Sequence, residues 1–204
     1  MRLRGYGSLR KSLPLSSMKG WHKMEDYIRF DRFIDLETSL ELLLVQIQGV
    51  PMTATCWKWA LIAAHSALQS SVCIALRGSA GFDTLKPKDR DKWLDAYENN
   101  KDLPNTQLDN FMALFDKLFD IESGIDRELI SKLNGYRNNF IHFNNDGWSI
   151  APKDILDAIG ESVSAMVAAP TRSKEIFFYE ERQSHRFNAL CQTTREKLKD
   201  LADT

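Results

Sequence analysis

Residues 53–76 constrain the fold more than any other segment, because their apolar side chains would point in nearly every direction around a helix. The segment is interrupted by Lys58, His65, Gln69 and a serine pair, so it lacks the uniform apolar stretch of roughly 18–20 residues that a membrane span needs. A helix that is apolar all round is stable in water only where other helices surround it. The sequence therefore predicts a central helix in a helical bundle, with no membrane association.

The other segments show apolar residues at the spacing of amphipathic helices. Expected helices cover residues 29–48, 53–76, 108–119, 126–145 and 152–168, a short stretch from Asp89 or Asp91 to Tyr97, and a charged C-terminal segment within 173–201. Asp126 is expected to cap the helix at 126–145, and Pro170 to separate the C-terminal segment. Trp148–Ile150 is the only short strand-like segment. The predicted class is all-α: four to five core helices, an insertion after the second helix at residues 79–105, and an additional C-terminal helix.

Charge divides the chain into a basic leader and an acidic body. Residues 1–24 hold six of the 27 lysines and arginines and no acid, which leaves 21 basic against 28 acidic residues, or −7, for residues 25–204. The leader is expected to be disordered, although it could be a nucleic-acid-binding arm, or upstream codons preceding a true start at Met18 or Met24. The predicted organisation is leader 1–24, bundle 25–170 and C-terminal helical extension 171–204. The acidic body argues against a broad nucleic-acid surface, so any RNA contact would be local.

The cysteines and histidines indicate neither a disulfide framework nor a metal site. Cys56, Cys73 and Cys191 are odd in number and far apart, which favours a reducing cytoplasm. His22 and His185 have no companion at the spacing of metal ligands. We therefore expect no metal and no cofactor.

The segment LNGYRNNFIHF, residues 133–143, places polar residues in an unusual pattern on its helix. At about 100° per residue, Ser131, Asn134, Asn138, His142 and Asn145 share one arc opposite an apolar arc, whereas Arg137 falls inside the apolar arc. Solvated faces usually carry Lys and Glu, but this polar arc carries no formal charge. An uncharged stripe suits a ligand or a two-fold contact between copies of the chain, with Ser131, Asn134 and Asn145 as interface candidates.

Arg137 and His142 also have structural explanations. A buried guanidinium needs an acceptor, which could be a carboxylate such as Glu37 or Glu41. His142 could complement the negative end of its helix. In the central helix, His65 could be a satisfied core residue, and Gln69 could hydrogen-bond Arg137 or Asn138.

Arg137-Asn138-Asn139-Phe140-Ile141-His142 resembles the Arg–(four residues)–His motif of HEPN domains, in which Asn commonly follows the Arg. The context is also similar, because the motif lies on a late helix of an all-α domain and His65 and Gln69 occupy the helix that faces the motif in that family. The resemblance covers about residues 31–168. It implies a HEPN-like bundle with Arg137 and His142 as catalytic residues, and Asn138, His65 and Gln69 as supporting or ligand-binding residues.

Family members that are ribonucleases use the RNA's own 2′-hydroxyl and no metal, which requires a base, an acid and a cation for the developing phosphorane charge. Histidine suits the proton transfers and arginine suits the phosphate. One histidine per motif implies a homodimer in which each chain brings its His142 to a shared cleft. The resemblance also implies a toxin or defence role with a small nucleotidyltransferase-like antitoxin as partner. Two alternatives stay open: a catalytically silent module that binds a nucleotide, RNA or protein, and a purely structural helical dimer.

Overall fold

The computed structural model describes residues 28–77, 81–142, 146–173 and 175–203, so the basic leader at 1–24 lies outside it. Within these residues the chain is all-α, with seven α-helices, two short 3₁₀ helices and no β-strand. The elements in order are α1 (Arg32–Gly49), α2 (Cys56–Leu76), η2 (Phe82–Thr84), α3 (Pro87–Glu98), α4 (Phe111–Leu118), η3 (Ile121–Ser123), α5 (Arg127–His142), α6 (Pro152–Arg172) and α7 (Glu181–Ala202).

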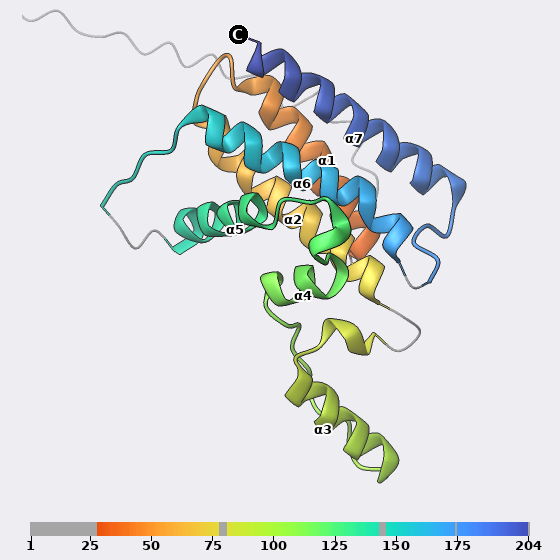
Figure 1. Cartoon of the computed structure of the whole chain (residues 1–204). Coiled ribbons are helices and arrows are strands. Elements are labelled where there is room, and N and C mark those ends of the chain that lie inside the picture. The colour runs from red at the N-terminus through yellow and green to blue at the C-terminus, as the bar shows by residue number, and fades with distance from the viewer. Residues whose placement is uncertain (1–27, 78–80, 143–145, 174, 204) are drawn as a thin grey trace, which may run out of the picture.

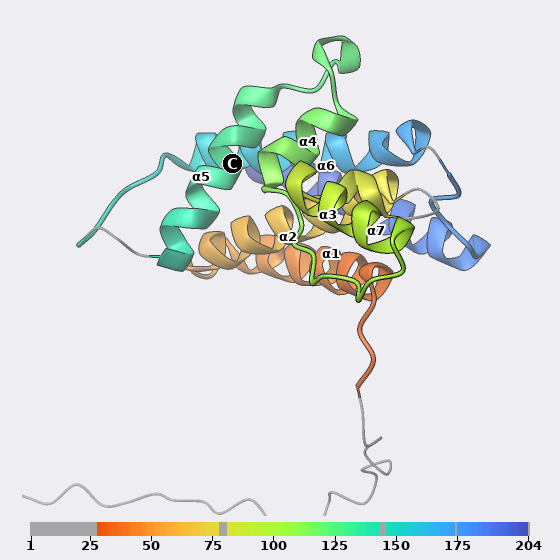
Figure 2. The same cartoon turned by 90° about the horizontal axis from the view of Figure 1, so that it is seen from below.

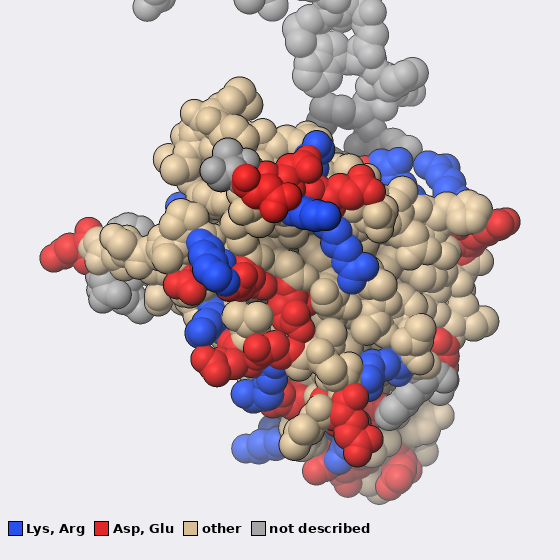
Figure 3. Space-filling view, turned by 45° about the horizontal axis from the view of Figure 1, so that its top comes forward, with Lys and Arg blue, Asp and Glu red and all other residues tan. Residues whose placement is uncertain are grey.

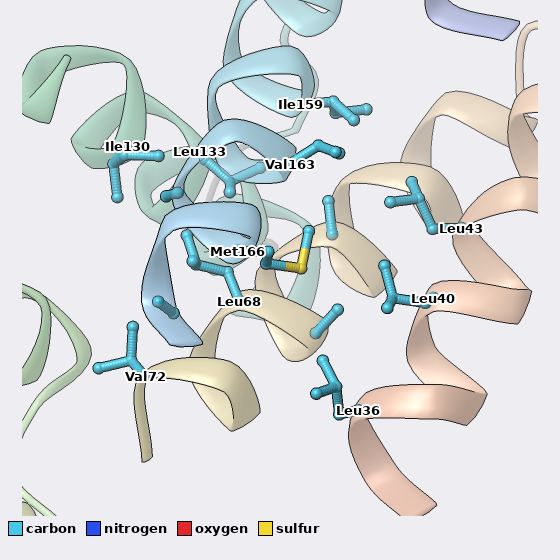
Figure 4. Packing of buried hydrophobic residues seen from close by; sticks show 14 of the residues in the cluster. Leu36, Leu40, Leu43, Leu68, Val72, Ile130, Leu133, Ile159, Val163 and Met166 are labelled. Carbon is cyan, nitrogen blue, oxygen red and sulfur yellow. The ribbon is translucent and has the colours of Figure 1, made fainter. Parts of the chain in front are cut away.

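The central position predicted for the second helix is confirmed. Helix α2 packs against α1, α4, α5 and α6, and its side chains are buried almost without interruption from Ala60 to Leu76. The expectation that this segment falls short of a membrane span is wrong by length and composition, since among the described helices α2 alone is long and apolar enough to cross a membrane; 72% of its most apolar window is buried inside the protein. Leucines of α1, α2 and α5 meet Ile159, Val163 and Met166 of α6 around this helix, as Figure 4 shows.

Helices α1 and α7 close one side of the bundle. Asp31 caps α1 by accepting hydrogen bonds from the backbone nitrogens of Phe33 and Ile34, both at 3.0 Å. Helix α7 packs along α1 and α6, where it buries Phe187, and its Arg186 makes ion pairs with two carboxylates of α1. The C-terminal helix is therefore part of the same packed core.

Three expectations about element boundaries are wrong. Helix α3 begins at Pro87, so neither Asp89 nor Asp91 caps it; proline fits the first helical position, where its missing N–H has no partner to lose. Helix α6 continues through Pro170 to Arg172, since the fixed φ of proline is helical and Pro170 lies in the last turn, where little helix follows the hydrogen bond that it cannot donate. Residues 148–150 form no strand, and the isolated β-bridge instead joins Leu85 to Leu108.

Residues 82–109, here called the arm, project from the bundle with α3 at their far end (Figure 1). Lys117 of α4 ties both ends of the arm together: its Nζ donates to the carbonyl oxygens of Asp83 and Leu85, at 3.1 and 3.3 Å, and to Asp109 Oδ2 at 3.0 Å. Inside the arm, Trp93 stacks on Tyr97 with ring centroids 5.3 Å apart. The arm thus has its own small aromatic cluster, and a lysine of α4 bonds to both of its ends.

We expect Lys117→Met to loosen the base of the arm while leaving the bundle folded. The substitution removes three hydrogen bonds but keeps the aliphatic stem, so amides 84–86 and 107–109 should exchange hydrogen about tenfold faster, equivalent to roughly 1–2 kcal/mol of local stability. Lys101→Met is the matched control, because Lys101 pairs with Asp95 in an exposed position at 3.1 Å. Equal exchange rates in the two variants would contradict a clamping role for Lys117.

The clamp is also sensitive to acid. Burial by itself raises the pKa of Asp109, but the hydrogen bond and charge of Lys117, the Asn110 backbone amide and the charge of Lys86 together lower that pKa below its usual value. The stabilisation is therefore complete above the ordinary carboxyl pKa of about 4 and is lost as the pH falls through the lowered value.

Candidate functional site at the α2–α5 contact

Helix α5 carries the Arg137–His142 motif and is fixed at its start and along its apolar face. The expected cap is confirmed, since Asp126 Oδ1 accepts hydrogen bonds from the backbone nitrogens of Glu128 and Leu129 at 2.8 and 3.2 Å. Ile130 and Leu133 are fully buried against the bundle. Capping and packing together determine where the polar residues of the next two turns point.

Arg137 is half-buried at the inner side of α5, as its place in the apolar arc predicts. Its Nη1 donates to Asn138 Oδ1 at 3.0 Å, while its Nε is buried and has no hydrogen-bond partner. No carboxylate among the described residues forms an ion pair with Arg137. The expectation that Glu37 or Glu41 could neutralise it is wrong, because both pair with Arg186 of α7.

His65 is a buried, neutral residue of the same contact. Its ring is 2% exposed and lies 4.3 Å from the Phe111 ring of α4, centroid to centroid, and its Nε2 hydrogen-bonds Asn134 Oδ1 at 3.0 Å. Burial, opposed in part by the Asn134 hydrogen bond and reinforced by the charge of Arg137, lowers the pKa of His65 to about 4. In the neutral ring, Nε2–H donates to the amide oxygen, so Nδ1 is a buried acceptor with no partner among the described residues.

The supporting residues are therefore arranged differently from the expected pattern. His65 contacts Asn134, one turn before Asn138, and no hydrogen bond joins Gln69 to Arg137 or Asn138 in the described part of the chain. Asn134 was expected to face a second copy of the chain. Instead, its side chain hydrogen-bonds His65 of the same chain. The crossing of α2 and α5 turns this part of the polar arc inward.

The remaining members of the polar arc are accessible. His142 is exposed at the last residue of α5, and Ser131 is exposed about three helical turns earlier. Asn145 lies outside the described residues. His142 follows Arg137 by five positions, with four residues between them, which places the two side chains about 140° apart around the helix. One chain alone does not direct both side chains into the same space.

A group of aromatic residues with one lysine lies where α2 begins and α5 ends, and sequence reasoning did not identify it. Lys58 Nζ lies 5.0 Å from the ring centroid of Trp59 and 5.9 Å from that of Phe140, and Phe140 packs on Trp148 at 4.6 Å. Trp59 is 49% exposed. Both views of the fold place the first turns of α2 beside the C-terminal end of α5 (Figures 1 and 2). The sequence signal was Lys58 itself, a lone cation in an otherwise apolar helix.

Away from the α2–α5 contact, the surface carries both acidic and basic side chains. On the face that Figure 3 shows, basic and acidic side chains lie intermingled with wide uncharged areas between them. Within the described ranges, no three His, Cys, Asp or Glu side chains are grouped so as to hold a metal ion. Cys73 and Cys191 are buried free thiols, and burial raises the pKa of both, to about 12 for Cys191. These cysteines are therefore not reactive thiolates.

Comparison of the chain with protein-family models, with curated proteins and with solved structures found no match. The chemistry of the site is therefore inferred from its own residues and their geometry.

Proposed function

We propose that this chain is a HEPN-like, metal-independent endoribonuclease that acts as a homodimer, with Arg137 and His142 as its catalytic residues. The observation that carries the proposal is the state of Arg137: a half-buried guanidinium on a rigid helix, beside solvent-accessible polar residues, with no carboxylate partner in the described part of the chain. A buried cation without a counter-ion is expensive, and a bound phosphate would neutralise it through a fork-shaped, charge-assisted contact.

The proposed reaction is an internal transesterification. A neutral His142 takes the proton of the ribose 2′-hydroxyl, whose oxygen attacks the adjacent phosphorus, while Arg137 stabilises the charge that develops on the phosphoryl oxygens. The bond from phosphorus to the 5′-oxygen breaks, and a protonated His142 supplies the proton to that leaving oxygen. The products are a 2′,3′-cyclic phosphate and a 5′-hydroxyl end.

Two chains are needed because each supplies one motif histidine for two proton transfers. The angle of about 140° between Arg137 and His142 around α5 fits this requirement, since one chain does not direct both side chains into the same space. Exposure of Ser131 and His142 leaves this face of α5 free to meet its copy.

RNA binding is proposed to be local, at the end of α5. Lys58 offers a cation for the phosphate backbone, and Trp59 offers an exposed ring on which a base can stack. Residues 25–204 carry a net charge of −7, which is compatible with a small RNA contact but not with a broad basic RNA-binding surface. By the same resemblance, the enzyme would be a cytoplasmic toxin or defence component, held in check by a nucleotidyltransferase-like antitoxin.

A catalytically silent module is the second candidate. The observation that favours it is the engagement of Asn134 with His65 inside one chain, which removes one residue from the expected dimer face. In that case Arg137, Lys58 and Trp59 would bind RNA or a nucleotide, and His142 would serve no proton transfer.

The test is cleavage of a defined RNA by the full chain in the presence of EDTA. We expect cleavage to continue under chelation and to yield cyclic phosphate ends, because side chains perform the proton transfers. The same RNA with one 2′-deoxynucleotide at the cleavage position should be bound but not cut there, since the nucleophile is missing. Cutting at the deoxynucleotide would rule out the 2′-hydroxyl mechanism, and tight binding without any cleavage would establish the silent module.

A further inference from the structure

A cavity lies at the end of the bundle away from the C-terminal end of α5. Its volume is about 520 Å³, and it is formed by residues 29–33 at the start of α1, the end of α2 and residues 175–183, which lead into α7. These three segments come together on the same side of the molecule in both views, away from the C-terminal end of α5 (Figures 1 and 2). This volume falls within the range of roughly 300–1,000 Å³ that is typical of small-molecule sites.

Three arginines line this cavity: Arg29, Arg32 and Arg77. None of them forms an ion pair with a carboxylate of the residues that the structure describes. The Arg32 guanidinium is held in place by donating from Nη1 to the carbonyl oxygen of Cys73 at 3.4 Å, which leaves its other N–H groups available. The cavity therefore presents several cationic donors at once.

Two carboxylates at the rim are already committed to helix caps. Asp31 accepts from two backbone nitrogens of α1, and Glu180 forms a reciprocal capping box with Gln183 at the start of α7. A third, Glu175, is exposed. Both capped helices also direct the positive ends of their dipoles towards this region. The lining carries three arginines and three carboxylates, so its formal charge balances; because the caps hold Asp31 and Glu180 against the starts of α1 and α7, the arginines are the groups that face an anion.

The cavity also offers a flat apolar surface and an amide donor. Tyr179 is 65% exposed, and its ring meets Phe33 edge-on with centroids 6.0 Å apart, which leaves a ring face free for stacking. The Oε1 atom of Gln183 accepts from the backbone nitrogens of Tyr179 and Glu180, at 3.0 and 3.2 Å, so its amide N–H groups point to other partners. A planar, hydrogen-bonding ring joined to a phosphate matches both features.

We propose that this cavity binds a nucleoside phosphate, with the phosphate on Arg29, Arg32 and Arg77 and the base against Tyr179. The site is separate from the Arg137–His142 motif, so it needs no RNA cleavage and no dimer. Bound there, the ligand would join the starts of α1 and α7 to the end of α2.

The test is calorimetric titration of the full chain with ADP, pyrophosphate and adenosine. We expect ADP to bind more tightly than pyrophosphate, because stacking adds to the ionic contacts, and adenosine to bind most weakly. Arg77→Gln should weaken ADP and pyrophosphate alike by about tenfold or more, as loss of a charge-assisted contact predicts. Arg195→Gln, which removes one exposed arginine of α7 outside the cavity, is the matched control and should bind as wild type does.

Tyr179→Ala separates the two halves of the proposal. It should weaken ADP by about tenfold through loss of stacking and leave pyrophosphate unchanged, whereas Tyr179→Phe should keep wild-type affinity for both. Circular dichroism checks that each variant keeps its helices. The proposal is overturned if ADP and pyrophosphate do not bind at millimolar concentration, or if Arg77→Gln and Arg195→Gln bind them equally.

Discussion

Replacing His142 by alanine should lower the rate of RNA cleavage by about 10²–10⁴-fold while leaving RNA binding within about twofold of wild type. The imidazole carries the proton transfers in the proposed mechanism, whereas Lys58, Trp59 and Arg137 supply the binding contacts. His142 is exposed at the end of α5, so its truncation removes no core packing. Single-turnover cleavage and filter binding of the same RNA measure the two quantities separately.

His185→Ala is the control for this substitution. His185 is exposed on α7 and lies 3.5 Å from Glu181, so it has no part in the proposed site and its loss should leave cleavage unchanged. If His142→Ala cleaves RNA as fast as wild type, His142 has no catalytic role. The silent module or the structural dimer would then explain the motif.

Mixing experiments examine the need for two chains. A ninefold excess of His142→Ala, added with exchange of subunits, should reduce the activity of a fixed amount of wild type to about one tenth, because random pairing gives each wild-type chain about one chance in ten of a wild-type partner. Activity that does not change on mixing would show that one chain suffices.

The second large effect concerns the stability of the fold. The free energy of unfolding should fall by on the order of 3 kcal/mol between pH 6.5 and pH 4, owing to His65 alone. Burial holds the pKa of this ring at about 4, while the same ring in the unfolded chain titrates near 6.5, so the unfolded state binds the proton first as the pH falls. The stabilisation is complete above pH 6.5 and is lost progressively down to about pH 4.

His65→Gln should flatten this part of the pH profile, because glutamine can donate to Asn134 Oδ1 without binding a proton. Urea denaturation at a series of pH values measures the effect, and His185→Gln serves as the exposed control with an unaltered profile. A His65→Gln profile as steep as that of wild type would mean that other groups are responsible.

Local sequence patterns predicted those parts of the fold that depend only on residues close together in the sequence. The all-round apolar composition of residues 53–76 predicted a surrounded helix, and Asp126 predicted the start of α5, because burial and capping depend on neighbours close in sequence. The half-buried position of Arg137 was also predictable, since it depends only on helical periodicity.

The details of the candidate site depend on how helices cross, which no local pattern specifies. A difference of one turn in the contact between α2 and α5 decides whether His65 meets Asn134 or Asn138. The same crossing brings Lys58 to Phe140, a pair separated by more than eighty residues of chain. Likewise, Arg186 forms ion pairs with Glu37 and Glu41 only because α7 packs along α1.

The arm leaves the bundle and returns to it at adjacent points that Lys117 holds together. The geometry of the helices around α2 therefore does not depend on the length or content of the chain between residues 86 and 107. Within that stretch the exposed loop at residues 99–103 is the position where a fluorescent protein or an affinity tag can be inserted without changing the connectivity of the core. Such an insertion would let the subunits be counted and followed while both proposed sites keep their native surroundings.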